Sequence, residues 1–386
     1  MTDPATIPDV DEDPVYYPTP IATVSNGSAI IADAITQIKE IIAGDGANCT
    51  KCKEALVVGK KAAQLVPSMI PDAMVALCEA TKFASNATCS DDYQAGSFGA
   101  IFTQILALGD MAGLDGEYVC ASLSTHFCKS PYTLPSKPTF PKPKPSNYAI
   151  PKASGKRVKV LHLSDFHLDP RYDYHTESNC SSGLCCRPST SARQVTVPAP
   201  LYGAFKCDTP YFLGTAALES VGPLTGTTHE NKSCDWDQFA WTVYTGDLVS
   251  HDSQNQLSRN YTQYTEYSVY HMFKSYIPSG PIFPVLGNHD SNPEAIDAPH
   301  SLPGVLGQQQ SWNYEHVSAL WQQNNWISPE AAAEARMHYA AYSINHPVYP
   351  KLRIITLNTD FWFVKLLPFL RRPPTYIYTL GTSQTI

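Results

Sequence analysis

Hydrophobic positions follow a helical period in the first third of the chain and gather into short continuous runs further on. Between residues 28 and 43 apolar side chains recur every three to four positions, which predicts an amphipathic helix that the Gly44-Asp-Gly46 turn ends. Further apolar stretches indicate a compact set of helices, punctuated by prolines and a glycine-containing turn. These helices are predicted at residues 55–66, 72–83, 98–107 and 118–127.

Three β-branched apolar runs predict strands in the later part of the chain. They cover residues 156–163, 241–245 and 281–286. Each run leads into polar residues whose side chains can bind metals: Asp165-Phe-His167, Gly246-Asp247 and Gly287-Asn-His-Asp290. Because open α/β sheets bind ligands at the carboxyl ends of their strands, we expect the three polar segments to meet at one rim of a sheet.

Composition divides the 386 residues into segments of different character. Residues 131–155 alternate Pro with Lys, which is typical of an extended, semi-rigid spacer. The first twenty residues are acidic and rich in Pro, so we expect them to be disordered. The predicted organisation is an N-terminal segment with one helix (1–44), a cysteine-rich helical domain (45–130), a linker (131–155), an α/β domain (156–362) and an atypical tail (363–386).

Charge and hydropathy narrow the class of protein. The formal net charge of −8 offers no basic field for nucleic acid, and no segment has the length of a transmembrane helix. Eleven cysteines and several Asn-x-Ser/Thr sequons indicate a secreted protein or one of a lysosomal or vacuolar compartment. No signal peptide is visible, which we interpret as an incomplete N-terminus rather than a cytosolic location. The sequon asparagines are Asn26, Asn48, Asn86, Asn179, Asn231 and Asn260.

Six cysteines lie in the helical domain, and their spacing alone does not fix their pairing. The segment resembles a saposin B-type domain in Cys49-Thr-Lys-Cys52 at its start and in Tyr118-Val-Cys120 and Phe127-Cys128 at its end. A helical hairpin that opens toward lipid is what this resemblance implies. The alternative is a disulfide-stapled bundle with no lipid role, because apolar helical faces are usually core. The implied disulfides are Cys49–Cys128, Cys52–Cys120 and Cys78–Cys89.

The three polar segments carry ligands that suit a pair of divalent metals. Asp165 can bridge two cations, since a carboxylate has two oxygens, and His289 places a titratable ring at the same rim. Asp290 is expected to orient that ring. Taken singly, each segment is an ordinary strand end or turn, but in this order, each after a strand, they predict a two-metal phosphoesterase site. The predicted metal ligands are Asp165, His167, Asp247 and Asn288.

The order of these segments resembles the calcineurin-like metallophosphoesterase superfamily. Within it, four stretches resemble the acid sphingomyelinases: residues 163–172, 206–210, 245–252 and 284–290. A saposin B-type domain joined by a Pro-rich linker to such a phosphoesterase is that family's own arrangement. The fold class implied is therefore α+β and multidomain, with a small disulfide-stapled helical domain followed by an incomplete α/β domain, a β-sandwich with flanking helices.

The resemblance also implies roles and a reaction. The four predicted ligands match positions that bind zinc, His289 matches the histidine that donates a proton to the leaving oxygen, and His251 matches the one that helps to hold the phosphate. The implied reaction is hydrolysis of sphingomyelin to ceramide and phosphocholine, with two divalent metal ions, at a membrane or lipid surface. Disulfides Cys180–Cys185 and Cys186–Cys207 fit the same family, which leaves Cys234 without an assigned partner.

The resemblance weakens toward the end of the chain. The superfamily pattern includes a Gly-His pair and a Gly-His-x-His segment downstream of Asn288, and neither occurs in these residues. Residues 352–362 still fit as a strand entering a loop, whereas residues 363–386 do not fit. We therefore expect a truncated sequence with little or no hydrolase activity. Two alternatives stay open: a metallophosphoesterase for another phosphoester, and a non-catalytic saposin-type lipid-binding protein.

Overall fold

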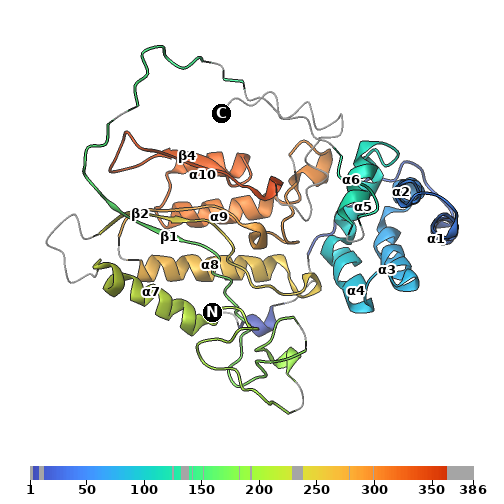
Figure 1. Ribbon diagram of the computed structural model, residues 1–386, viewed down its shortest axis with the longest axis horizontal. Helices are drawn as coiled ribbons and strands as arrows, with labels where there is room; N and C mark the ends of the chain where they lie inside the picture. The colour runs from blue at the N-terminus through green and yellow to red at the C-terminus, as the bar shows by residue number, and fades with distance from the viewer. Residues whose placement is uncertain are drawn as a thin grey trace.

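The computed structural model combines helices and strands in two units (Figure 1). It describes residues 3–7, 13–123, 126–131, 139–140, 142–150, 152–181, 183–191, 194–227, 238–277, 279–298 and 300–362. We call residues 27–128 the helical unit and residues 159–362 the strand unit. The predictions for Asn231, Cys234 and the tail at 363–386 lie outside the described residues.

The helical unit confirms the five helices predicted from hydrophobic periodicity. Helix α1 begins where the side chain of Asn26 accepts a hydrogen bond from the Ala29 N–H at 3.0 Å. A sixth helix, α4, was not predicted because its sequence is polar and lacks an apolar period; the Ser85 side chain caps it. The helices are α1 (Gly27–Ala43), α2 (Asn48–Leu65), α3 (Ile70–Thr81), α4 (Asn86–Tyr93), α5 (Ala100–Leu108) and α6 (Leu114–Ser122).

Three disulfides cross-link this unit, and its packed core is thin. The bonds are Cys49–Cys128, Cys52–Cys120 and Cys78–Cys89, the same pairs that the resemblance implies. The buried apolar side chains around α1, α2 and α5 are mostly alanines. An apolar cavity of about 440 Å³ lies between α1, α2 and α3. The staples therefore hold together helices that bury few large side chains against one another.

The strand unit is built on a parallel sheet in the order β1–β2–β3, at the predicted positions. Helices α7 and α8 make the connections between its strands, and β4 and β5 form a separate antiparallel pair. The mixed helix and sheet character is confirmed; a sandwich of two packed sheets stays a prediction. The strands are β1 (Lys159–Leu163), β2 (Phe239–Tyr244), β3 (Ile282–Pro284), β4 (Tyr342–Asn345) and β5 (Arg353–Thr356), and the helices are α7 (Tyr211–Thr225), α8 (Arg259–Tyr276), α9 (Ser311–Gln323) and α10 (Pro329–Met337).

Large aromatic side chains fill the core of the strand unit. Tyr244 on β2, Phe273 on α8 and Trp321 on α9 are completely buried and belong to one continuous cluster. The ring centroids of Tyr244 and Phe273 are 4.9 Å apart in an edge-to-face arrangement. This cluster fixes the sheet against α8 and α9, and thereby fixes the positions at which the three strands end.

Polar contacts join the two units. The side chains of Gln104 on α5 and Gln309 exchange two hydrogen bonds of 3.0 Å, and both are buried. Residues 13–20 lie against the same junction, where the Asp13 carboxylate accepts hydrogen bonds from the Arg259 N–H and the Asn292 amide. Residues 13–16 thus make defined contacts, and disorder of the rest of the first twenty residues stays a prediction. The Asp13 carboxylate is held here because it accepts these two hydrogen bonds.

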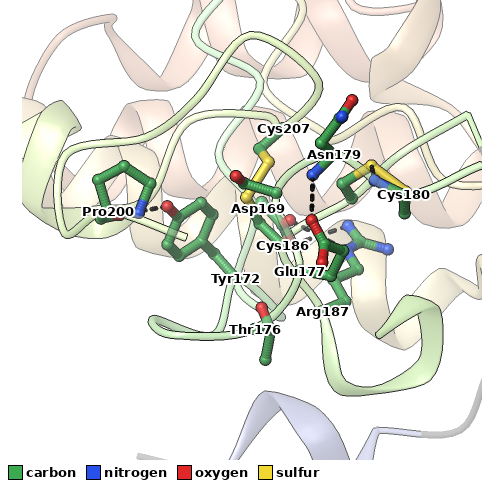
Figure 2. Close-up of a disulfide and its surroundings, with 12 residues drawn as sticks. Asp169, Tyr172, Thr176, Glu177, Asn179, Cys180, Cys186, Arg187, Pro200 and Cys207 are labelled. Carbon is green, nitrogen blue, oxygen red and sulfur yellow. Dashed lines mark hydrogen bonds and ion pairs between the residues drawn. A yellow bond between two sulfur atoms is a disulfide. The ribbon is translucent and has the colours of Figure 1, made fainter. Parts of the chain in front are cut away.

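A long irregular segment, residues 170–210, connects β1 to α7; we call it the insertion. Two further disulfides cross-link it, Cys180–Cys185 and Cys186–Cys207, again the pairs that fit the resemblance. Figure 2 shows the buried Glu177 in this segment, whose carboxylate accepts hydrogen bonds from the N–H groups of Asn179 and Thr196. The described residues of the insertion include no strand and no long helix, yet disulfides and buried polar groups give them a defined course.

Two surface features bear on the compartment. The sequon asparagines within the described residues are all exposed, as attachment of a glycan requires. They are Asn26, Asn48, Asn86, Asn179 and Asn260. Among the helices of the described residues, none combines the length and the apolar character needed to cross a bilayer.

Candidate metal centre

The three predicted polar segments meet at the carboxyl ends of β1, β2 and β3, which we call the rim. The backbone N–H groups of Asp165 and His167 donate to the carbonyl oxygens of Gly246 and Asp247 at 2.9 and 3.0 Å. A Cβ on Gly246 would lie 2.1 Å from the Gly287 nitrogen, so only glycine permits this approach. Gly246 therefore lets the end of β2 touch the segment that follows β3.

Three of the rim residues have left-handed backbone angles. The φ values are 55° at Asp165, 38° at His167 and 65° at Asp247. Non-glycine residues adopt such angles at a cost, and they do so most often where a site requires them. The backbone at these three residues therefore adopts a costly conformation that places their side chains at the rim.

Asp165, His167 and Asp247 form the first group that could hold a metal ion. The Nδ1 atom of His167 lies 2.8 Å from the Val249 carbonyl oxygen, which leaves Nε2 for another partner. Nε2 lies 3.9 Å from Asp165 Oδ1 and 3.8 Å from Asp247 Oδ2. Two ligands of one ion, each about 2 Å from it, lie about 3–4 Å apart. These distances and donor types therefore fit a divalent cation.

Three histidines form a second, overlapping group at the rim. The ring centroid of His167 lies 4.0 Å from that of His251 and 5.0 Å from that of His289. His251 is held there by Asp208, whose Oδ1 is 3.0 Å from His251 Nδ1 and whose Oδ2 accepts from the His251 N–H at 2.5 Å. Asp208 was missed as a site residue, although residues 206–210 were among the stretches that carry the resemblance.

Glu294 is another residue that the sequence patterns missed. Its Oε1 lies 3.5 Å from His289 Nε2 and accepts a hydrogen bond of 2.9 Å from the Asn288 side-chain amide. That bond orients the amide so that the oxygen of Asn288 faces away from Glu294. Glu294 lies beyond the Gly-Asn-His-Asp segment and belongs to no motif, so only the fold brings it to the rim.

Asp290 has a different role from the one predicted. It is completely buried, and its carboxylate accepts hydrogen bonds from the N–H groups of Gly287, Asp247 and Leu248 at 2.8, 2.8 and 2.6 Å. The prediction that Asp290 orients the His289 ring is therefore wrong, because the turn that follows β3 directs this side chain inward. Asp290 instead ties the ends of β2 and β3 together. Burial, reinforced by the charge of Asp247, raises the pKa of Asp290 to about 7.

The two rim histidines other than His167 have opposite pKa shifts. The hydrogen bond that the His251 ring makes to the Asp208 carboxylate raises the pKa of His251. Burial, together with the nearby charges of His251 and His167, lowers the pKa of His289 to about 4. The two rings therefore differ in how readily they bind a proton.

Comparisons with known proteins point to one family of phosphodiesterases. The chain is 29% identical over 245 residues to sphingomyelin phosphodiesterase 2 of Caenorhabditis elegans, which is 58% of this chain and 37% of that protein. It is 27% identical over 229 residues to human sphingomyelin phosphodiesterase, which covers 58% of the chain and 33% of that protein. The human cyclic GMP-AMP phosphodiesterase SMPDL3A is 28% identical over 248 residues, 64% of the chain and 46% of that protein.

The matches cover only part of each relative. The chain spans between 33% and 46% of the length of these three proteins. A search with family models returned no match. All three relatives are named as phosphodiesterases; two names give sphingomyelin as the substrate and the third gives cyclic GMP-AMP.

Proposed function

This chain belongs to the acid sphingomyelinase family of phosphodiesterases, and on that premise we propose that it is a metal-dependent hydrolase for the phosphodiester of a sphingolipid. The observation that carries the proposal is the meeting of Asp165, His167 and Asp247 at the ends of neighbouring strands, with His251 and His289 beside them. Phosphodiester hydrolysis requires charge neutralisation and proton transfer, and this set of side chains offers both.

The metal ligands in this proposal are Asp165, His167, Asp247 and Asn288. Imidazole and carboxylate ligands favour zinc, and two bound ions would supply positive charge at the phosphoryl oxygens and an ionised water. Asp165 and Asp247 each bring two oxygens to the rim. The Val249 carbonyl fixes the tautomer of His167 that presents Nε2 to the ion.

In this proposal the two remaining histidines have different roles: His251 binds the phosphate and His289 donates a proton. His251, held by Asp208, is placed to donate a hydrogen bond to a phosphoryl oxygen when its ring is protonated. His289 gives a proton to the leaving oxygen, and its lowered pKa makes it a strong donor once protonated. Glu294, 3.5 Å from His289 Nε2, is placed to help His289 acquire that proton.

We further propose that the helical unit is a saposin-type domain that brings the lipid to the rim. Its apolar cavity of about 440 Å³ has the chemistry to hold hydrocarbon. The domain bounds proposed are those from the sequence, with a linker at 131–155 and glycosylation at the sequons. The location proposed is secreted or lysosomal.

The direct test is zinc binding and phosphocholine release by the purified chain on sphingomyelin vesicles. We expect zinc binding in calorimetry that Asp247→Asn weakens by more than the roughly 10–100-fold that loss of an outer-shell partner costs. Glu219→Gln, on the exposed side of α7, is the control and should bind zinc like the parent. We propose that the chain alone turns over slowly, because the family pattern includes further histidines. Absence of zinc binding, or release that is unaffected by Asp247→Asn, would contradict the metal-dependent mechanism.

One comparison favours a second substrate class. The SMPDL3A match covers 64% of the chain, as much as the best lipid-directed match, and that protein is named for a cyclic dinucleotide. The same assay with a cyclic dinucleotide in place of vesicles separates the two. Lipid binding without hydrolysis of either substrate would instead favour a non-catalytic lipid-binding protein.

A further inference from the structure

We propose that Arg187 and Asp208 are positioning residues that together clamp the His251-Asp252 dipeptide, with the Cys186–Cys207 disulfide as the base of the clamp. The inference rests on the proposed function only in the task it gives to His251. The contacts that define the clamp stand independently of any reaction.

The clamp follows from the sequence positions of its residues relative to the Cys186–Cys207 disulfide. Arg187 directly follows Cys186 and Asp208 directly follows Cys207, so one disulfide places both side chains. Their partners, His251 and Asp252, are also consecutive in the sequence. Figure 2 shows Arg187 and Asp169 in the surroundings of this disulfide. Two arms that start from one cross-link thus hold two neighbouring residues of the rim.

The Asp208 arm fixes both the backbone and the ring of His251. Its two oxygens accept from the His251 N–H and from Nδ1, at 2.5 and 3.0 Å. The side chain of Asp208 is 13% exposed, whereas that of His251 is 51% exposed. The half-exposed ring contacts the rings of His167 and His289, and Asp208 adds the hydrogen bond that fixes its rotation.

The Arg187 arm fixes the next residue through buried charges. The guanidinium, 3% exposed, donates from Nη2 to Asp252 Oδ2 at 2.8 Å, and Nη1 donates to Asp252 Oδ1. It also donates to both oxygens of Asp169, at 2.8 and 3.0 Å. Asp169 lies two residues after His167, so one guanidinium holds the segments that carry both histidines. The planar fork of arginine suits such paired carboxylates, and lysine cannot reproduce it.

Backbone bonds join the end of the insertion to the same rim. The Thr209 N–H donates to the His167 carbonyl oxygen at 3.1 Å, and the Asp169 N–H donates to the Thr209 carbonyl oxygen at 2.9 Å. Leu168 bridges Thr209 on one side and Val249 on the other. Residues 207–209 therefore extend the rim as an additional edge, and the insertion is part of the site rather than an appendage.

The alternative is that Arg187, Asp208 and the Cys186–Cys207 disulfide only stabilise the insertion. Variants of the two neighbouring disulfides of the insertion distinguish this alternative from the clamp. The variant Cys186→Ser/Cys207→Ser opens the base of the clamp, whereas Cys180→Ser/Cys185→Ser opens the neighbouring disulfide of the same segment. The readout is the ring nitrogen signal of His251 in ¹⁵N-histidine-labelled chain, assigned by its loss in His251→Gln. We expect the first variant to shift or broaden this signal and the second to leave it in place. Equal changes in both variants, or none in either, would overturn the clamp.

Single substitutions test the arms while every disulfide stays intact, in case the first variant does not fold. At a pH high enough for the His251 ring to be neutral, Asp208→Asn should change it from the Nδ1–H to the Nε2–H tautomer, because the amide group of Asn can donate to Nδ1 where the carboxylate accepted. Arg187→Lys should broaden the signal while keeping the tautomer. Glu177→Gln, a buried carboxyl of the insertion that does not contact the rim, is the matched control and should leave the signal unchanged. An unchanged tautomer in Asp208→Asn would refute the arm assigned to Asp208.

The clamp and the proposed function can fail separately. The histidine signal requires neither zinc nor substrate, so a chain that hydrolyses nothing still reports on the clamp. If zinc binding and hydrolysis are found but the His251 signal ignores Asp208→Asn and Arg187→Lys, the clamp is wrong and the reaction stands.

Discussion

The helical unit and the strand unit reach a folded state by different means. In the helical unit the buried apolar side chains are mainly alanines and cysteines, and an apolar cavity lies beside them. In the strand unit the core combines many tyrosine, phenylalanine and tryptophan rings with large aliphatic side chains. Apolar burial stabilises in proportion to area, so the strand unit depends on packing and the helical unit on cross-links. This difference predicts that a cavity in the core destabilises the strand unit, whereas loss of a disulfide destabilises the helical unit.

The largest effect is expected from a cavity in the aromatic core. Phe273→Ala removes a completely buried ring that contacts Phe166, Tyr244 and Tyr270, and should lower the free energy of unfolding by about 3–5 kcal/mol. Guanidinium unfolding followed by tryptophan fluorescence measures it, because all six tryptophans lie beyond residue 230. Tyr267→Ala on the same helix, where the side chain is 48% exposed, should cost less than about 1 kcal/mol. Equal losses of unfolding free energy in the two variants would show that the strand unit does not depend on its buried aromatic rings.

Removing a long-range cross-link should affect the other unit. Cys52→Ser/Cys120→Ser opens a bond between residues 68 apart and should lower the free energy of unfolding of the helical unit by about 2–4 kcal/mol. The loss should appear in circular dichroism of the helices, while the tryptophan fluorescence midpoint stays where it was. If the fluorescence midpoint falls by as much as the midpoint of the helical signal, the two units unfold together. Their stabilities would then not depend on separate interactions.

The strand unit should also be the part that responds to pH. Asp297 is buried, and burial raises its pKa to about 6 even though Tyr314 and Asn358 donate hydrogen bonds to it. In the unfolded chain the same carboxyl titrates near 4, so the folded state binds more protons between these two values. This contribution to stability is therefore present at acidic pH and is lost as the pH rises from about 4 through about 6. Its size is about 3 kcal/mol.

Substitution of Asp297 isolates this effect. Asp297→Asn keeps a buried hydrogen-bonding group but cannot titrate, so the dependence of unfolding free energy on pH should become flatter between pH values of about 4 and 7. Thermal unfolding across that range is the measurement. A pH dependence identical to that of the parent chain would assign the effect to other carboxyls.

The strands and the meeting of three candidate ligands at the rim could be predicted because the necessary information is local. A β-branched run followed at once by Asp, His or Gly-Asp predicts a strand and what stands at its end. Parallel strands then bring Asp165, His167 and Asp247 together without any knowledge of the loops. Helix α4 was missed because it is polar, and its position depends on a serine cap and on packing against α3.

The partners of the histidines could not be predicted in the same way. Asp208 reaches His251 only because the insertion returns to the rim at residues 207–209, across more than forty positions of sequence. Glu294 arrives through the turn that follows Asp290, and no pattern marks it. Asp290 itself was assigned by its nearness in sequence to His289, but the turn geometry points its carboxylate at backbone N–H groups. Side-chain direction, rather than sequence distance, decides such roles.

The smallest expected effect concerns the junction, and it asks whether the two units are independent. Gln104→Leu leaves the buried Gln309 amide without its partner and should cost about 1–3 kcal/mol, as should Gln309→Leu. The double variant replaces both groups by apolar ones, so its cost should be clearly less than the sum of the single costs. If the cost appears equally in tryptophan fluorescence and in the helical signal, the amide pair couples the units. If neither signal shows a loss of unfolding free energy, the amide pair does not contribute to stability. The helical unit and the strand unit then fold independently.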